Sequence, residues 1–311
     1  MVSVLSRLQR VYRDIFHAPA RDQASDFSIA LPLPSRTGPG ALRVAVMIHM
    51  FHAEMAAEFR SLIDRSVADA DILISTDTEA KRRIIADAFS GRSDRVEIRL
   101  VENRGRDILP KLTSFTDRYA NYDLILFLHS KKSLHVTSER DWRTFLLDHL
   151  IGSPAIVSDI REIFAANPDI GMVFPQHFEP LRQFIAWGAH DNYPAALPMI
   201  ERLGVRMSPR MPLDFPSGSM FWCRPAALRP LLDLGLRACD FPDEEAQTDG
   251  TLGHAVERLF LASVEKAGYH WLKIAIPDHF AQRATIMSIE GPHAVPGFLR
   301  RYGFRVTGEA G

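Results

Sequence analysis

The sequence contains little cysteine, almost no net charge and no long apolar run. Its two cysteines, Cys223 and Cys239, form neither a C-x-x-C pair nor a zinc-binding spacing, which excludes a disulfide framework. The formal net charge of -1 over 311 residues argues against a protein that binds nucleic acid through a basic face. No stretch reaches the roughly eighteen apolar residues of a membrane span, and the N-terminus lacks an apolar secretory core. We therefore expect a cytoplasmic protein.

Composition divides the chain into three parts. Residues 1–17 carry apolar residues at helical spacing with three arginines off that stripe, so we expect an amphipathic helix. This helix either docks on the protein or lies peripherally on the anionic inner face of the cytoplasmic membrane. Residues 18–41, rich in Pro, Ser and Gly, are expected to be a linker that completes an N-terminal part over 1–41. The main domain is expected over 42–276, followed by a Gly- and Pro-rich C-terminal extension over 277–311.

From residue 42 onward, apolar runs typical of buried strands alternate with segments of helical periodicity. Strands are expected at 43–49, 71–76, 96–101, 122–128, 170–174, 221–224 and 270–276. Helices are expected at 53–66, 79–90, from the 103–107 turn to about 120, and at 142–150, 154–166 and 251–267, with a long connection over 175–215. This order predicts an α/β fold, in which a mainly parallel sheet with right-handed crossovers is flanked by helices.

Polar residues stand at the ends of four consecutive predicted strands. They are His49, Thr76 with Asp77, Asn103–Asp107, and His129–Lys132. Ligands of open α/β sheets bind outside the carboxyl ends of the strands, where these residues are expected to meet. Four such ends together predict a crevice for a polar ligand.

The NRGRD turn, Asn103 to Asp107, places Arg104 and Arg106 around Gly105 directly before a helix. Arginine suits bidentate phosphate binding, and a helix N-terminus adds exposed N–H donors. The turn therefore favours a phosphate or nucleotide contact. The alternative is a surface turn in which the arginines are solvated and Asp107 caps the helix.

The basic segment His129-Ser130-Lys131-Lys132 follows the most strand-like run of the chain. Many nucleotide-sugar transferases carry Asp-x-Asp at this position to hold a divalent ion against the diphosphate. Here an imidazole and two ammonium groups would neutralise a departing diphosphate without a metal, because developing charge is what must be stabilised. No cofactor is therefore assigned, a requirement for magnesium or manganese stays open, and a solvated basic loop is the alternative.

Two later segments complete the candidate site. In FPSGSMFW, residues 215–222, small residues beside aromatic ones suit a close backbone approach and a sugar-stacking surface, although a buried bend with core aromatics would look similar. In EEAQTDGTLGHAVER, residues 244–258, carboxylates precede a helix that carries His254. Asp249 is either a general base or the N-cap of that helix, and Glu245 is the alternative base.

These motifs resemble the rhamnan synthesis F family of polysaccharide glycosyltransferases over about residues 43–275. The matching segments are IHMF, NRGRDILP, HSKKS, IGMVFP, PSGSMFW and EEAQTDGTLGHAVERLF. The resemblance implies a single nucleotide-sugar-binding domain of GT-A-like fold. It also implies a nucleotide-diphosphate donor and transfer of rhamnose or a related deoxyhexose in cell-wall rhamnan, O-antigen or capsule assembly. An inverting reaction follows from the family's usual donor and product.

With this resemblance, each candidate residue has an expected role. The nucleotide sugar would contact His49, Thr76, Asp77, Asn103, Arg104, Gly105, Arg106, Asp107, His129, Lys131 and Lys132. The sugar or acceptor would contact Gly218, Ser219, Met220, Trp222 and His254, and the acceptor is a glycan or lipid-linked glycan. A non-catalytic component that binds glycan or nucleotide sugar is the alternative. A phosphoryl- or nucleotidyltransferase is disfavoured because no G-x-x-x-x-G-K-[ST] loop is present.

Overall fold

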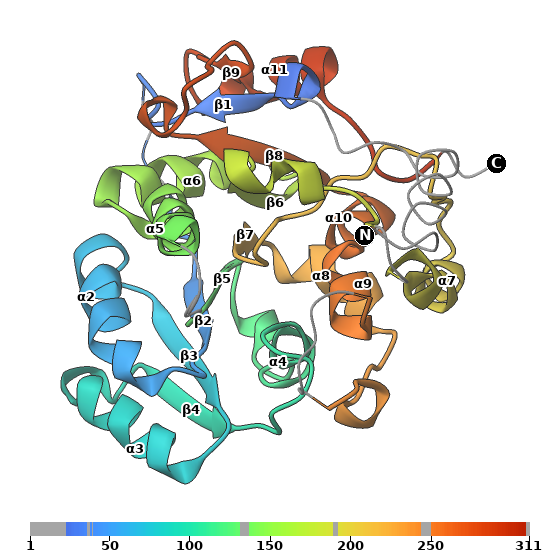
Figure 1. Ribbon diagram of the computed structural model, residues 1–311. Coiled ribbons are helices and arrows are strands. Elements are labelled where there is room, and N and C mark those ends of the chain that lie inside the picture. Colours follow the sequence, from blue (N-terminus) through green and yellow to red (C-terminus); the bar gives the residue numbers. More distant parts are fainter. Residues whose placement is uncertain are drawn as a thin grey trace.

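The computed structural model describes residues 23–35, 38, 40–130, 137–188, 192–243 and 250–308, with side chains between 131 and 141 left out. The strands are β1 (Ser28–Ala30), β2 (Val44–His49), β3 (Asp71–Thr76), β4 (Val96–Leu100), β5 (Leu124–His129), β6 (Ile170–Pro175), β7 (Phe221–Cys223), β8 (His270–Ala275) and β9 (Ile286–Met287). They form one sheet in the order β4-β3-β2-β5-β7-β6-β8-β1-β9 (Figure 1). Every pair is parallel except those of β7, which runs antiparallel to β5 and β6. The expected α/β, GT-A-like fold with a mainly parallel sheet is confirmed.

Helices cover both faces of this sheet because its central strands bury side chains on both sides. In β2, Val44, Val46 and Ile48 enter one hydrophobic core, while Ala45 and Met47 enter the other. The first core is completed by α2 (Ala56–Ser66), α3 (Glu79–Ala88), α5 (Thr137–Ile151), α6 (Pro154–Ala166) and α11 (Val295–Tyr302). The second is completed by α4 (Ile108–Thr113), α7 (Asn192–Leu203), α8 (Pro225–Leu232), α9 (Leu252–Glu257) and α10 (Phe260–Lys266).

Eight short 3-10 helices connect these elements. They are Gln23–Ser25, Ala53–Met55, Ser90–Arg92, Tyr119–Asn121, Glu179–Phe184, Ala238–Asp240, Pro277–His279 and Pro292–Ala294, counted within the described residues. No helix in this part of the chain is long and apolar enough to span a bilayer. The amphipathic helix expected over residues 1–17 lies outside the described residues.

Several elements differ from the sequence-based expectation. The helix after the NRGRD turn ends at Thr113 rather than near residue 120, and the helix expected over 251–267 is divided into α9 and α10. The expected connection over 175–215 contains α7, which the internal Pro198 had concealed. The sheet also extends beyond 42–276, because β1 from the expected linker and β9 from the expected extension join it.

The strand directions bring the predicted strand ends to one edge of the sheet. His49 at the end of β2 lies in register with Ser75 of β3 and with His129 of β5. Since β7 runs in the opposite direction, it begins at this edge, and Gly218 and Ser219 just before it lie near His129. Residues more than 150 positions apart in the sequence therefore converge there.

Candidate functional site

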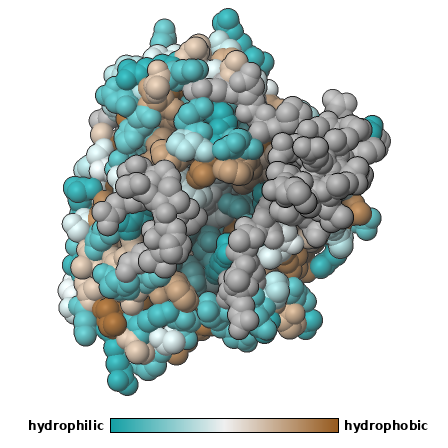
Figure 2. All heavy atoms as spheres, in the orientation of Figure 1, coloured by the Kyte–Doolittle hydropathy of each residue, from teal (hydrophilic) through white to brown (hydrophobic). Residues whose placement is uncertain are grey.

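Two histidines lie at the centre of this edge, one on each of two neighbouring strands. Nδ1 of His49 is 3.0 Å from the hydroxyl of Ser75, and Nε2 of His129 donates to the carbonyl of Gly218 at 2.8 Å. Both imidazoles are buried. Their orientations are therefore set by hydrogen bonds to the neighbouring strand and to the turn before β7. The face of the molecule seen in Figure 2 is hollowed near its middle, where hydrophilic atoms are exposed.

An aspartate–lysine pair on α4 faces the two histidines. The ammonium of Lys111 contacts the carboxylate of Asp107 and donates to the Asp107 carbonyl at 2.9 Å. Nε2 of His129 lies 3.8 Å from the same carboxylate. We refer to His49, Asp107, Lys111 and His129 as the central cluster. Asp107 stands at the N-cap of α4 but makes no side-chain capping bond, because its carboxylate is directed into this cluster.

Burial and mutual charge set the protonation states of the central cluster. Burial lowers the pKa of His49 to about 4, so its imidazole is neutral at pH 7. Burial alone would raise the pKa of Asp107, but the neighbouring His129 and Lys111 outweigh it and hold the pKa below its usual value. Burial also lowers the pKa of the Lys111 ammonium, which Asp107 opposes. The cluster thus presents a carboxylate beside an ammonium and an uncharged imidazole.

The turn before β7 is held rigidly beside His129. Its Gly218 N–H and Ser219 hydroxyl donate to one oxygen of Glu257, at 3.2 and 3.0 Å. Gly218 has a φ of +84°, and a Cβ there would meet Leu146 at 2.7 Å and Trp142 at 2.9 Å. Glycine is therefore required at this position by both conformation and space.

Backbone strain in the described residues is concentrated at the same place. Arg106 and Ser219 are the two described non-glycine residues with positive φ, at 50° and 55°. Such conformations cost energy and cluster at functional sites. Arg106 directs its guanidinium to within 3.4 Å of Nε2 of His254, whose Nδ1 is 2.8 Å from the Thr251 hydroxyl. The strain therefore supports a ligand site between the NRGRD turn and the start of α9.

The two arginines of the NRGRD turn differ in their partners. Arg104 donates to the carbonyl of Phe241 at 2.7 Å and forms an ion pair with Asp243. A Cβ at Gly105 would lie 2.6 Å from Leu109 and 2.8 Å from Phe241, so a glycine lets this loop pack closely. Arg104 thus ties the segment that leads to residues 244–249, while Arg106 is exposed and Asn103 lies exposed before it.

The end of β3 contributes one carboxylate, Asp77, whose side chain is mostly buried at 11% exposure. The Thr76 hydroxyl is buried and donates to the carbonyl of Met50 at 2.9 Å, so it supports the backbone of the β2 end. Asp77 forms an ion pair with Lys81 at 2.6 Å, and the Lys81 ammonium lies 3.7 Å from the centre of the Phe51 ring. Asp77 is therefore held in a partly buried ion pair with Lys81, and its contact with a ligand stays a prediction.

The expected sugar-stacking surface at Met220 and Trp222 is wrong for these two residues. Met220 and Trp222 are buried at 1% and 0% exposure, and both belong to the hydrophobic core. The Trp222 indole N–H donates to the Leu150 carbonyl at 2.9 Å. Both side chains pack in the first hydrophobic core, and β7, which carries Trp222, is inserted between β5 and β6. The other alternative, a bend with core aromatics, describes this segment.

Four candidates, Lys131, Lys132, Glu245 and Asp249, lie outside the described residues. Among the described candidates, the structure brings together His49, Asp107, His129, Gly218 and Ser219. It separately brings Arg106 into contact with His254. Sequence reasoning did not include Lys111, whose partner is Asp107, nor assign Glu257 to the turn before β7. The spacing of Asp107 and Lys111 by four residues at the start of a helix is the signal that could have identified the first pair.

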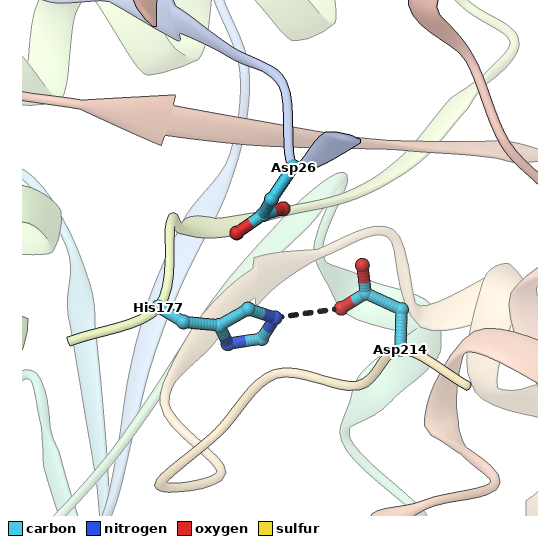
Figure 3. A group of neighbouring side chains, drawn as sticks. All are labelled: Asp26, His177 and Asp214. Carbon is cyan, nitrogen blue, oxygen red and sulfur yellow. Dashed lines mark hydrogen bonds and ion pairs between the residues drawn. The ribbon is translucent and has the colours of Figure 1, made fainter. Parts of the chain in front are cut away.

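Among the described residues, one group of three side chains has the composition of a metal site. Asp26, His177 and Asp214 are buried, and their ligand atoms lie within 4.8 Å of one another (Figure 3). The Lys273 ammonium contacts Asp26 and lies 2.6 Å from Asp214. Since the Lys273 ammonium contacts both carboxylates and the Arg182 guanidinium also pairs with Asp26, these residues fit a buried charge network better than a cation site.

Comparisons with known proteins identify one matching family and two similar proteins. The family described as rhamnan synthesis protein F matches residues 32–269. Two proteins called uncharacterized protein WxcX, from two strains of Xanthomonas campestris pv. campestris, are each 36% identical over 231 residues. Those alignments cover 72% of this chain and 32% of each relative, so the chain spans about a third of the length of the curated relatives it matches.

Proposed function

Since the chain belongs to the rhamnan synthesis protein F family, we propose that it is a glycosyltransferase of cell-surface polysaccharide synthesis. It moves rhamnose or a related deoxyhexose from a nucleotide-diphosphate donor to a glycan or lipid-linked glycan acceptor, with inversion. The observation that carries this proposal is the central cluster at the carboxyl edge of a GT-A-like sheet. In such sheets this edge is where ligands bind.

The proposed donor site follows from the charges at this edge. Arg106 is an exposed guanidinium next to a helix N-terminus and suits a phosphate oxygen. Asp77 would accept hydrogen bonds from the nucleoside. His129, together with Lys131 and Lys132 beyond the described residues, would balance the charge of the departing diphosphate. Each of these groups acts by binding or orienting the donor.

The proposed acceptor side lies toward the start of α9. His254 contacts Arg106, so the two sides of the site meet at this pair. Asp249 would take the proton of the acceptor hydroxyl, with Glu245 as the alternative base. A non-catalytic component of polysaccharide assembly would keep donor binding but would not depend on either carboxylate.

Nucleotide binding is expected to raise the melting temperature of the protein. A ligand at about a hundred times its dissociation constant stabilises the folded state by roughly 2.7 kcal/mol. TDP, UDP and GDP are therefore to be compared by thermal melting, and Arg106→Ala should diminish the shift. Arg301→Ala, which removes an exposed arginine on α11, is the matched control and should leave the shift unchanged. Absence of a shift with all three nucleotides would count against the transferase proposal.

Transfer is expected to persist in excess EDTA, because basic residues stand where a metal-binding acidic pair would be. Lys131→Ala should lower activity strongly, since it removes a cation from the diphosphate. Lys266→Ala on the exposed side of α10 serves as control. The measurement is release of nucleoside diphosphate from a nucleotide sugar. Complete loss with EDTA that magnesium or manganese restores would show that carboxylates bind a metal and that the argument from the HSKK segment is wrong.

A further inference from the structure

A buried network of charged and polar side chains lies beside the central cluster. Its members are Asp26, Arg182, His177, Asp214, Lys273 and Ser217, each at most 9% exposed (Figure 3 labels three of them). The side chains come from segments that are far apart in the sequence. Asp26 precedes β1, Lys273 lies in β8, and His177 follows β6. Asp214 and Ser217 lead into the turn before β7.

The contacts form a continuous chain from the N-terminal segment to that turn. Lys273 contacts Asp26 and donates to Asp214 at 2.6 Å. The other oxygen of Asp214 accepts from Nε2 of His177 at 2.9 Å, and Nδ1 of His177 lies 3.1 Å from the Ser217 hydroxyl. In the neutral imidazole with its proton on Nε2, Nδ1 is an acceptor, and Ser217 then donates to it.

Ser217 stands directly before Gly218, whose carbonyl accepts from His129. The position of the Ser217 side chain therefore bears on the hydrogen bond that orients an imidazole of the central cluster. Strand β1 is short and pairs with β8 through two residues, Ile29 and Ala30. The network gives the N-terminal segment a further attachment, and it joins that attachment to the turn.

The order Ser217, His177, Asp214 resembles the arrangement of a nucleophilic triad, but its surroundings point to a different role. A serine nucleophile needs nearby N–H donors for a developing oxyanion. Here the Gly218 N–H is bound by Glu257 and the Ser219 N–H by the carbonyl of Pro216 at 2.8 Å. His177 is also fully buried. The three side chains are therefore arranged to hold the backbone.

We infer that His177 is a positioning residue that, through Ser217, holds the Gly218–Ser219 turn against His129, and that Asp26, Lys273 and Asp214 extend this support to the N-terminal strand. The expected effect of this positioning on sugar transfer rests on the proposed function. The positioning itself does not, because the rigidity of the turn is measurable without substrate. Removing His177 would take one hydrogen bond from Asp214 and one from Ser217, and the members of a buried polar network orient one another through such bonds.

The test compares two fully buried histidines. His149 donates to the Phe145 carbonyl at 2.7 Å and accepts from the Ile276 N–H at 2.9 Å, so it makes two hydrogen bonds away from the turn. Hydrogen–deuterium exchange is measured on the peptide covering residues 215–222 in His177→Gln and His149→Gln. We expect about tenfold faster exchange in His177→Gln alone, the factor that corresponds to losing about 1.4 kcal/mol of hydrogen bonding. Equal exchange in both variants, or unchanged protection in His177→Gln, would overturn the inference.

Ser217→Ala provides a second variant, because it removes the hydroxyl and leaves the charged residues paired. It should reproduce the faster exchange even if His177→Gln fails to fold, and full protection in Ser217→Ala would contradict the positioning role. In a transfer assay, either variant should lower kcat at least tenfold while the nucleotide-induced melting shift is retained. If the wild-type protein neither binds nucleotides nor transfers sugar, the proposed function fails, while the exchange comparison still decides the inference.

Discussion

Asp249→Asn is expected to lower the turnover of sugar transfer by about a hundred- to ten-thousand-fold, with donor binding and melting temperature retained. An acceptor hydroxyl is a poor nucleophile until its proton is removed, and a positioned general base contributes a factor of this size. Asparagine keeps the size of the side chain and most of its capping capacity while it removes the base. The measurement compares kcat, nucleotide-induced melting shift and melting temperature with those of the wild-type protein.

Asp249 lies outside the described residues, but the two residues that follow it, Gly250 and Thr251, are described and are compatible with its proposed role as the base. The next residue, Gly250, has a φ of 80°, and its N–H donates to the side chain of Asn192 at 3.1 Å. The chain is thus held at the position just after the proposed base. The N-cap position of α9 is occupied by Thr251, two residues after Asp249, so Asp249 is not the N-cap residue of this helix.

Glu245→Gln is the control for this prediction, because Glu245 lies in the same carboxylate-rich segment. Near-normal turnover in Asp249→Asn with a large loss in Glu245→Gln would transfer the role to Glu245. Full turnover in both variants would refute the base mechanism, because neither carboxylate would then act as the base. Absence of turnover in the wild-type protein, with nucleotide binding retained, would favour the non-catalytic binding component.

The strands and their polar ends could be predicted because their signals are local. An apolar run such as residues 124–128 is typical of a strand buried on both faces of a sheet, and the polar residue that follows the run marks the end of the strand. The repeated strand–helix order then brings His49, Thr76 and His129 to one edge. These inferences needed no knowledge of distant contacts.

The remaining features depend on contacts between distant segments. Strand β7 has three residues, and its antiparallel place between β5 and β6 comes from pairing with both. That pairing buries Trp222, which the local sequence would equally allow at a surface. The network around Lys273 joins residues 247 positions apart, so no local spacing reveals it. Glu257 likewise meets Ser219 across 38 positions.

Asp107→Asn is expected to destabilise the protein by about 3–5 kcal/mol, because removing one member of a buried ion pair leaves the other charge unpaired. The side chain of Lys111 is 2% exposed and cannot move its ammonium into solvent. A lost helix cap does not explain this effect, since Asp107 makes no side-chain capping bond in α4. The free energy of unfolding is measured by urea denaturation, with the slope checked for constancy.

The double variant Asp107→Asn/Lys111→Met should recover part of this loss, because it removes the buried charge together with its partner. Asp233→Asn is the matched control: its pair with Arg229 on α8 has the same four-residue spacing but is exposed, so stability should change little. A cost below about 1 kcal/mol for Asp107→Asn would show that water reaches Lys111 and that the pair behaves like a surface pair. If the recovered double variant no longer shows a nucleotide-induced melting shift, the charges of the central cluster serve donor binding and not stability alone.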